Sequence, residues 1–365
     1  MPEQVDLKII PNPSPVATEQ RRKLLENPGF GKIFTDHMVT IRWQAERGWH
    51  DAQVRRREPF LLDPACAALH YAQEIFEGMK AYKMATDDVA LFRPEQNARR
   101  FARSAERMAM PPVPEDIFLE AVTALVDIDR GWIPDGDGSL YLRPFMFASE
   151  AFLGVRPAAE YIFCVIACPV GPYFKGGAKP LTLWVSQDYS RAAPGGTGDA
   201  KCGGNYAASL LAQADAVRNG CDQVIFLDAL EHRWVEELGG MNLFFVMDDG
   251  RIVTPPLSGT ILPGITRDSI ITLARDRGIA VDERRYSLTQ WREDAESGRL
   301  VEAFACGTAA VVAGIGEVRS RDGAFKVGSG DIGLLTAALL DELIALQRGM
   351  LADTRGWHRK ILVRD

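Results

Sequence analysis

Glycine surrounds a single lysine in the segment Gly195–Tyr206, which reads GGTGDAKCGGNY. A lysine amine among small residues can condense with an aldehyde cofactor, because the bare backbone lets a flat ligand approach closely. A phosphate loop is the first alternative, but the required Gly-Lys-Ser/Thr order is missing, since Lys201 follows Ala200 and precedes Cys202. The dinucleotide-binding fingerprint also fails, because Lys201 stands where its third glycine belongs. A lysine beside glycines is by itself more often an exposed loop residue, so residues elsewhere in the chain that could support a cofactor must decide between the two interpretations.

Pyridoxal phosphate is the aldehyde cofactor that this segment suggests, and a protein must supply three supports for it. A carboxylate must face the pyridine nitrogen, and Glu236 and Glu237 stand in an apolar stretch before an expected strand. A phenol or amide must meet the ring oxygen, and donors must hold the phosphate. The segment Leu262–Asp268 opens an expected helix, so the backbone N–H groups of Ile265 and Thr266 can face an anion there.

Two further segments offer phosphate donors. The turn Ala305–Ala309 follows an expected strand and is a second candidate anion site. Phe92-Arg93-Pro94 leads into a helix that bears Arg99 and Arg100, and arginine can hold a phosphate through two hydrogen bonds. Either arginine can take this role, and we favour Arg100.

The elements that must position these residues fall into two stretches of mixed helix and strand. Small residues at 176–177 and 192–198 flank a strand at 181–186 and mark the expected boundary. Strand runs followed by mixed helices favour two α/β or α+β domains over one doubly wound sheet. We expect strands at 33–42, 48–54, 75–83, 89–92, 140–147, 161–167, 181–186, 223–227, 243–247 and 251–254, and helices at 65–71, 97–108, 115–128, 206–218, 267–277 and 331–347, the last capped by Asp331.

Composition excludes several classes of protein. The 365 residues are 47% hydrophobic and 25% charged, which is typical of globular domains. A net charge of −7 argues against nucleic acid as a partner, and no apolar stretch approaches the roughly 20 residues of a membrane span. Without a signal-peptide pattern, we expect a cytoplasmic protein. The 6 cysteines form no C-x-x-C and the 5 histidines no H-E-x-x-H, so we expect no metal site.

Seven motifs in order make the sequence resemble the branched-chain amino acid aminotransferases, which are fold-type IV pyridoxal-phosphate enzymes. Each motif alone is weak, but the ordered set is specific, and the resemblance runs from about Gly31 to the C-terminus. The motifs are Glu74–Tyr82, Phe92–Pro94 with Asn97 and Arg100, Ser139–Pro144, Gly195–Tyr206, Glu237–Phe244, Leu262–Asp268 and Cys306–Ala309.

The resemblance implies a role for each matching residue. Lys201 would bind the cofactor covalently, and Glu237 would face the pyridine nitrogen. Glu236 would lie on the opposite side if this segment is extended. Tyr206 would contact the ring oxygen. The phosphate would be held by Arg100, Ile265, Thr266 and Thr308.

The resemblance also implies transfer of the amino group from leucine, isoleucine or valine to 2-oxoglutarate, with Lys201 removing and returning the α-proton. Tyr141 and Arg143 stand two apart on one strand, so both can face one pocket. Aromatic walls suit branched side chains, and Arg143 is the candidate for the distal carboxylate of glutamate. The pocket would be lined by Tyr71, Phe76, Tyr141, Arg143 and Tyr173, with the N–H of Ala309 near the substrate carboxylate.

Two positions depart from patterns of some family members. Gly240 stands where some have threonine, which affects one carboxylate contact. The stretch 310–313 reads AVVA where some animal members carry C-x-x-C, so we expect no redox regulation through such a pair.

The fold-type IV architecture implies a small N-terminal α/β domain at 1–172, a connection at 173–196 and a larger C-terminal domain at 197–365, with the cofactor at the interface. The family forms homodimers, in which Tyr71 and Leu153 would reach the neighbouring subunit's pocket. D-amino-acid aminotransferases and aminodeoxychorismate lyases are alternatives with the same fold. A kinase-like or ATPase nucleotide-binding protein and a non-catalytic binding module are alternatives outside it.

Overall fold

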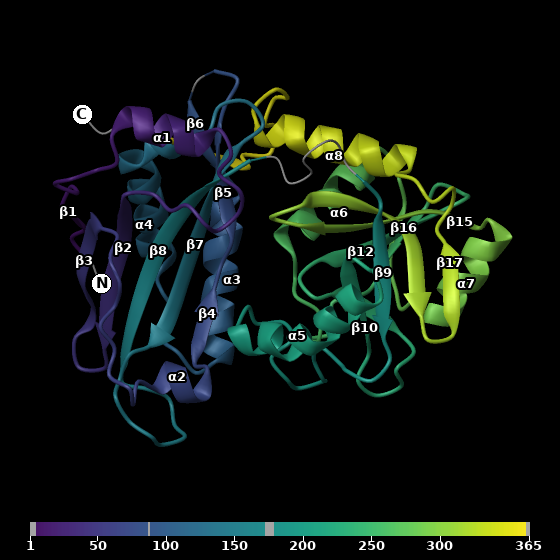
Figure 1. Ribbon diagram of the computed structural model, residues 1–365, viewed down its shortest axis with the longest axis horizontal. Coiled ribbons are helices and arrows are strands. Elements are labelled where there is room, and N and C mark those ends of the chain that lie inside the picture. The colour runs from purple at the N-terminus through teal and green to yellow at the C-terminus, as the bar shows by residue number, and fades with distance from the viewer. Residues whose placement is uncertain (1–4, 87, 172–178, 363–365) are drawn as a thin grey trace. The chain divides into compact units, whose positions relative to one another are not determined.

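The computed structural model describes residues 5–86, 88–171 and 179–362, and the chain forms two compact units (Figure 1). Unit 1 comprises Met1–Pro172, Ala200–Gly203 and Leu346–Asp365, and unit 2 comprises Tyr173–Asp199 and Gly204–Ala345. The segment 200–203 and the C-terminal residues thus group with the N-terminal unit, whereas the chain-order division expected above gives them to the second domain. Tyr173, an expected pocket residue, lies outside the described residues.

Unit 1 is built on a mostly antiparallel sheet. The strands are β1 (Lys8–Ile9), β2 (His37–Gln44), β3 (Gly48–Arg56), β4 (Glu74–Phe76), β5 (Met79–Lys83), β6 (Val89–Phe92), β7 (Ser139–Ala148), β8 (Glu160–Val170) and β18 (His358–Ile361). Within the described residues their order is β1-β3-β2-β8-β7-β5-β6-β18, and β4 pairs with β7 beside this path. The helices are α1 (Thr18–Leu25), α2 (Ala67–Tyr71), α3 (Pro94–Arg107), α4 (Glu115–Ile128) and the 3-10 turn η1 (Arg130–Trp132).

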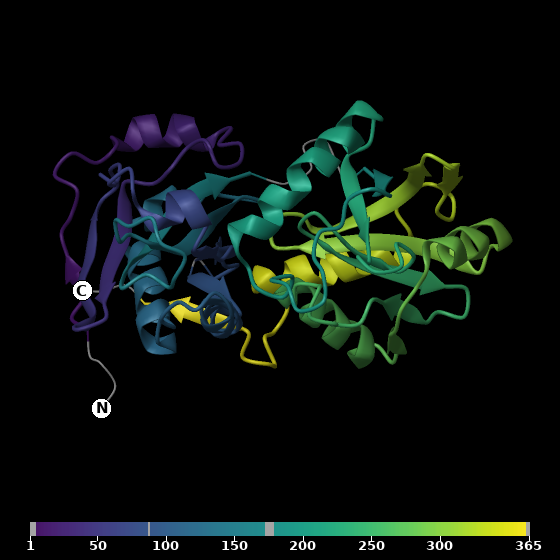
Figure 2. The same cartoon turned by 90° about the horizontal axis from the view of Figure 1, so that it is seen from below.

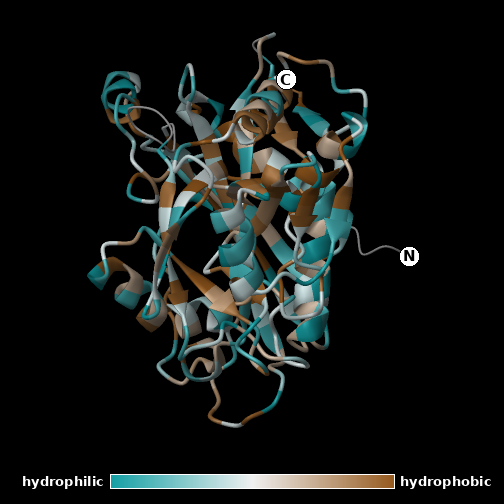
Figure 3. Ribbon diagram, turned by 90° about the vertical axis from the view of Figure 1, so that its right-hand side faces the viewer, coloured by the Kyte–Doolittle hydropathy of each residue, from teal (hydrophilic) through white to brown (hydrophobic). Residues whose placement is uncertain are grey.

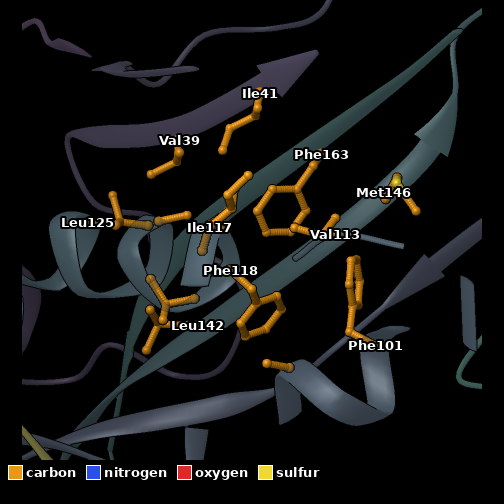
Figure 4. Packing of buried hydrophobic residues seen from close by; sticks show 14 of the residues in the cluster. Val39, Ile41, Phe101, Val113, Ile117, Phe118, Leu125, Leu142, Met146 and Phe163 are labelled. Carbon is orange, nitrogen blue, oxygen red and sulfur yellow. The ribbon is translucent and has the colours of Figure 1, made fainter. Parts of the chain in front are cut away.

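The core of unit 1 lies between the sheet and the helices α3 and α4. These two helices pack against each other, and α4 also packs against β2 and β8 (Figure 2). The ring centroids of Phe101 of α3, Phe118 of α4 and Phe163 of β8 lie 5.4–5.8 Å apart. Figure 4 shows these three side chains within the cluster of buried hydrophobic residues. Burial of such apolar side chains is the main stabilising contribution to this layer, so α3 is a rigid support for the residues that it carries.

Unit 2 contains a sheet that closes on itself. The strands are β9 (Leu181–Ser186), β10 (Gln223–Leu227), β11 (Val235–Leu238), β12 (Asn242–Met247), β13 (Ile252–Thr254), β14 (Val281–Glu283), β15 (Leu300–Gly307), β16 (Val311–Ser320) and β17 (Gly323–Lys326). In the described part of the chain, β11-β10-β9-β16-β15-β12 follow one another, and β11 also pairs with β12, so these strands form a ring. The helices are α5 (Gly203–Arg218), α6 (Ile265–Asp276), α7 (Leu288–Ser297) and α8 (Leu334–Gln347).

Apolar side chains fill the interior of unit 2. Phe245 of β12 lies 4.5 Å from Tyr286 and 4.8 Å from Trp291, measured between ring centroids. Figure 3 shows hydrophobic residues concentrated on the strands and hydrophilic ones on loops and helix faces. This distribution explains why most strands could be recognised from their apolar, β-branched or aromatic content.

The observed elements differ from the expected ones at several places. The single strand expected over 75–83 is wrong, because Glu77 and Gly78 separate β4 from β5. The final helix begins at Leu334 rather than at Asp331, and the carboxylate of Glu302 in β15 caps it from outside. Several elements lie outside every expected range, among them helices α1 and α7 and strands β1, β14, β16, β17 and β18.

Candidate active site

The backbone of Lys201 is held by unit 1 on both sides. The amide N–H of Lys201 donates to Oγ of Ser104 in α3 at 2.9 Å, and its carbonyl oxygen accepts from the N–H of Phe76 at 2.9 Å. The next residue, Cys202, is buried and forms a β-bridge with Ile75. The backbone of Lys201 and Cys202 therefore pairs with β4 in the way of a neighbouring antiparallel strand.

The Lys201 side chain lies in a cluster with three expected pocket residues. Its Nζ is 4.8 Å from the centroid of the Phe76 ring, and the Arg143 guanidinium carbon is 4.7 Å from the same centroid. Arg143 also donates from Nη2 to the Tyr141 hydroxyl at 3.0 Å. Both cationic groups are attracted to the face of the Phe76 ring. Phe76, Tyr141 and Arg143 thus form one wall beside the Lys201 amine.

Gly78 makes this wall possible, although the sequence motif gave it no role. A Cβ at Gly78 would lie 2.1 Å from the hydroxyl oxygen of Tyr141. Only glycine leaves room for the Tyr141 side chain at this point. The signal available in the sequence was the glycine directly after Glu77 in an otherwise strand-like run.

Arg100, the expected phosphate ligand, is buried in α3 and paired with Glu77. Its Nε and Nη2 donate to the two carboxylate oxygens of Glu77 at 2.7 and 2.8 Å, and Asn97 donates to the same carboxylate at 2.7 Å. Burial alone would raise the pKa of Glu77, but the Arg100 charge and these hydrogen bonds, with a contribution from the charge of Lys201, hold that pKa below its usual range. The alternative, Arg99, is exposed and pairs with Glu115 at 3.1 Å.

Glu237 of β11 is buried in unit 2 beside an arginine that sequence reasoning missed. Nη1 of Arg191 lies 2.8 Å from Oε1 of Glu237, and both side chains are 2% exposed. The N–H of Leu262 donates to Oε1 at 2.9 Å, and Asn242 donates to Oε2 at 3.4 Å. Nη1 of Arg191 also donates to the carbonyl of Thr260 at 2.9 Å. This network holds a buried carboxylate in one orientation.

Glu236 points into a different environment from Glu237, as the extended segment predicts. Its Oε1 accepts a short hydrogen bond from Oγ1 of Thr260. Among the described residues, its buried Oε2 has no hydrogen-bond partner. Burial raises the pKa of Glu236, with Asp228 adding to the rise, while the Thr260 bond and Arg191 lower it.

Asn242 links Glu237 to the start of α6. Besides Glu237, its Nδ2 bonds the carbonyl of Leu262 at 3.0 Å, and a Cβ at Gly264 would lie 2.0 Å from its Oδ1. Gly264 is the N-cap of α6, whose first residue is Ile265. Asn242 therefore places the N-terminus of α6 close to the Glu237 carboxylate.

Four other expected site residues lie in helices or turns of the two units. Tyr206 stands in the first turns of α5, with its Cε1 3.7 Å from where a Cβ at Gly240 would be. Thr308 and Ala309 form the half-buried turn between β15 and β16. Tyr71 ends α2 in unit 1 and is 39% exposed.

Comparison with known proteins defines the class. The sequence pattern described as Amino-transferase class IV matches residues 74–318. The chain is 55% identical to a probable branched-chain-amino-acid aminotransferase of Streptomyces coelicolor over 353 residues, covering 96% of this chain and 97% of the relative. It is 52% identical to the branched-chain-amino-acid aminotransferase of Mycolicibacterium smegmatis over 362 residues, covering 98% of each. The chain belongs to the class IV aminotransferase family.

Solved structures agree with this membership. The branched-chain amino acid aminotransferase of Escherichia coli matches with a TM-score of 0.72 at 31% identity, covering 89% of this chain and 100% of that one. The PLP-form, or holo-form, of the branched-chain amino acid aminotransferase from Thermobaculum terrenum matches with a TM-score of 0.69 at 26% identity, covering 88% and 98%. The predicted family and the predicted fold-type IV class are confirmed.

The family implies pyridoxal phosphate as the cofactor, and the donor set of this chain fits it. Lys201 supplies an amine, and Glu237 supplies a buried carboxylate whose charge Arg191 balances. The first turn of α6 presents backbone N–H groups, as a phosphate site requires, and its N-cap Gly264 lies so close to Asn242 that a Cβ there would clash with it. In the described residues no group of three or more His, Cys, Asp or Glu is arranged to hold a metal ion, and no helix is both long and apolar enough to cross a bilayer.

Proposed function

We propose that the protein is a branched-chain-amino-acid transaminase. It transfers the amino group of leucine, isoleucine or valine to 2-oxoglutarate and so forms branched 2-oxo acids and glutamate. The names of the relatives at 52–55% identity support this activity. The observation that carries it in this chain is the position of the Lys201 amine on the Phe76 ring beside Arg143.

The proposed roles of the cofactor-binding residues follow from their chemistry. Bound pyridoxal phosphate supplies an electron-withdrawing ring that acidifies the α-proton of the amino acid. Lys201 would hold the cofactor covalently at rest, and its released Nζ would take the proton from the α-carbon of the amino acid and deliver it to the cofactor carbon. Glu237, balanced by Arg191, keeps a negative charge for the pyridine nitrogen. The proposed donors to the ring oxygen and the phosphate are Tyr206, Arg100, Ile265, Thr266 and Thr308.

Substrate selection is assigned to the wall that contains Phe76. Phe76 and Tyr141 offer apolar area to a branched side chain. Nε of Arg143 is buried without a hydrogen-bond partner among the described residues, which suits a donor awaiting the distal carboxylate of glutamate. The same proposal gives Tyr71 and Tyr173 to the pocket and the N–H of Ala309 to the substrate carboxylate.

We also propose a homodimer in the cytoplasm. Large apolar side chains stand exposed on unit 1, including Tyr71 at 39% and Leu153 at 67%. In the proposed homodimer, Tyr71 and Leu153 would be buried against the second copy. Light scattering after size-exclusion chromatography tests it, and a monomer at micromolar concentration would refute it.

The test of the function uses the absorbance spectrum and a chemical trap. The purified protein should show a visible cofactor band that L-leucine shifts and 2-oxoglutarate restores. Borohydride reduction followed by peptide mapping should place the cofactor on Lys201. Lys201→Ala should lose multiple-turnover transamination, whereas the exposed control Lys179→Ala should keep it. A reduced adduct elsewhere, or activity with D- but not L-amino acids, would contradict the proposal.

A further inference from the structure

The four residues Ala200–Gly203 group with unit 1, while the chain on both sides of them belongs to unit 2. Cys202 is 1% exposed and lies within the hydrophobic core of unit 1. Lys201 therefore belongs to unit 1, whereas the chain before Ala200 and after Gly203 belongs to unit 2. The position of the Lys201 amine therefore depends on the hydrogen bonds between unit 1 and the backbone of residues 200–203.

Two side chains of unit 1 accept hydrogen bonds from the backbone of this segment. Ser104 lies inside α3, where main-chain groups are already bonded within the helix, so only its hydroxyl can accept the Lys201 N–H. Glu74 accepts the N–H of Gly203 at 2.6 Å through Oε1. A Cβ at Gly203 would lie 1.9 Å from that oxygen, so glycine is what allows the carboxylate to reach.

We propose that Ser104 and Glu74 are positioning residues, which fix the backbone before and after the lysine so that its amine stays at the Phe76 ring. This inference rests on the proposed role of Lys201. Between these two points, the N–H of Phe76 binds the Lys201 carbonyl. These contacts include two backbone hydrogen bonds of Lys201 and one of Gly203.

The same elements tie the lysine to the proposed phosphate ligand. Arg100 and Ser104 are four residues apart on α3 and so share one face of the helix. Glu77, which pairs with Arg100, directly follows Phe76. One helix and one strand therefore set the spacing between the Lys201 backbone and Arg100, independently of the cofactor.

Amide hydrogen exchange in the full-length, cofactor-free protein tests the Ser104 contact directly. Ser104→Ala should speed exchange of the Lys201 amide by about tenfold or more, because the N–H loses its acceptor. Ser104→Thr keeps the hydroxyl and should restore slow exchange. The control Thr336→Ala removes a buried hydroxyl bonded to Glu302 in unit 2 and should leave the Lys201 amide unchanged. Equal exchange in the wild type and Ser104→Ala would overturn the inference.

Steady-state kinetics then tests the consequence. Misplacement of the amine should lower kcat of Ser104→Ala by roughly 10- to 100-fold. KM for L-leucine should stay within about threefold, since the pocket wall is intact. Ser104→Thr should recover most of kcat. A loss confined to KM, or no rescue by threonine, would count against a positioning role.

A double-mutant cycle tests Glu74. Glu74→Ala should lower kcat, and Gly203→Ala should do so by forcing the carboxylate away. Because the methyl group added at position 203 no longer meets a carboxylate in the Glu74→Ala background, the double variant should fall no more than about twofold below Glu74→Ala alone. Losses that multiply would overturn the assignment of Glu74.

These results separate the inference from the proposed function. If the wild type binds no pyridoxal phosphate and has no transaminase activity, the proposed function fails, while the exchange data still report whether Ser104 holds the lysine. If the wild type is active and the variants match it in exchange and kcat, only the positioning inference fails.

Discussion

Replacing Arg191 with methionine should destabilise unit 2 strongly, because it leaves the Glu237 carboxylate buried without its counterion. At the observed 2.8 Å, the attraction between two unit charges is about 6 kcal/mol at an effective dielectric constant of about 20. Desolvation of both groups offsets part of this energy, so breaking the pair from one side should lower the free energy of unfolding by about 3–5 kcal/mol. Urea denaturation of the cofactor-free protein, followed by circular dichroism, measures the loss.

A matched comparison isolates the buried charge as the cause. Arg191→Met combined with Glu237→Gln removes both charges and should recover much of the stability, because the amide can still accept the N–H of Leu262. Arg321→Met, which breaks an exposed pair with Asp188 in the same unit, should change stability little. An Arg191→Met protein within about 1 kcal/mol of wild type, or no recovery in the double variant, would refute the reasoning.

Three further predictions concern other contacts. Gly78→Ala should displace Tyr141, at an overpacking cost of roughly 1–3 kcal/mol, and raise KM for L-leucine; an unchanged KM would contradict the assigned close contact. Burial raises the pKa of Glu236 above its ordinary value of 4.5. The free energy of unfolding therefore falls as the pH rises from 4.5 to the folded pKa, because the buried side chain must lose its proton. Glu236→Gln should therefore match wild-type stability near pH 4 and exceed it at pH 8 in urea titrations, with the difference developing above pH 4.5 and staying constant above the folded pKa. A difference of the opposite sign would contradict this argument. Glu302→Ala should lower the free energy of unfolding by about 1–2 kcal/mol, because the first turn of α8 loses the acceptor of its N–H groups. Thermal unfolding measures this loss, and a loss smaller than that caused by replacing an exposed glutamate would contradict the capping role.

Residues whose signal is local could be predicted from the sequence. The glycines around Lys201 indicate a backbone that approaches other groups closely. Gly203 does so, because a Cβ at this position would clash with the Glu74 carboxylate. Two carboxylates in an extended apolar segment alternate sides, and Glu236 and Glu237 of β11 do so. The helix starting at Ile265, two residues before the expected 267, follows from the Pro-Gly sequence in front of it.

Residues whose partner is distant in the chain could not be predicted in this way. Arg191 is 46 positions from Glu237, and nothing beside it in sequence indicates a buried ion pair. Ser104 is a small polar residue within a helical pattern, and its hydroxyl is important only because residue 201 reaches it, 97 positions later. Such pairs are created by the tertiary fold, so hydrophobic periodicity and turn chemistry carry no information about them.

The break between β4 and β5 shows how the site overrides the local pattern. The run from Ile75 to Lys83 has the composition of one strand, yet the chain leaves the ladder at Glu77 and Gly78. Glu77 must turn inward to bind Arg100, and Gly78 must make room for Tyr141, so continuing the strand would cost both contacts. A strand interrupted in this way has less ladder pairing than its composition allows. The compensation is that β4 can instead pair with the lysine segment, through Ile75 and Phe76, so the interruption and the placement of Lys201 are one structural solution.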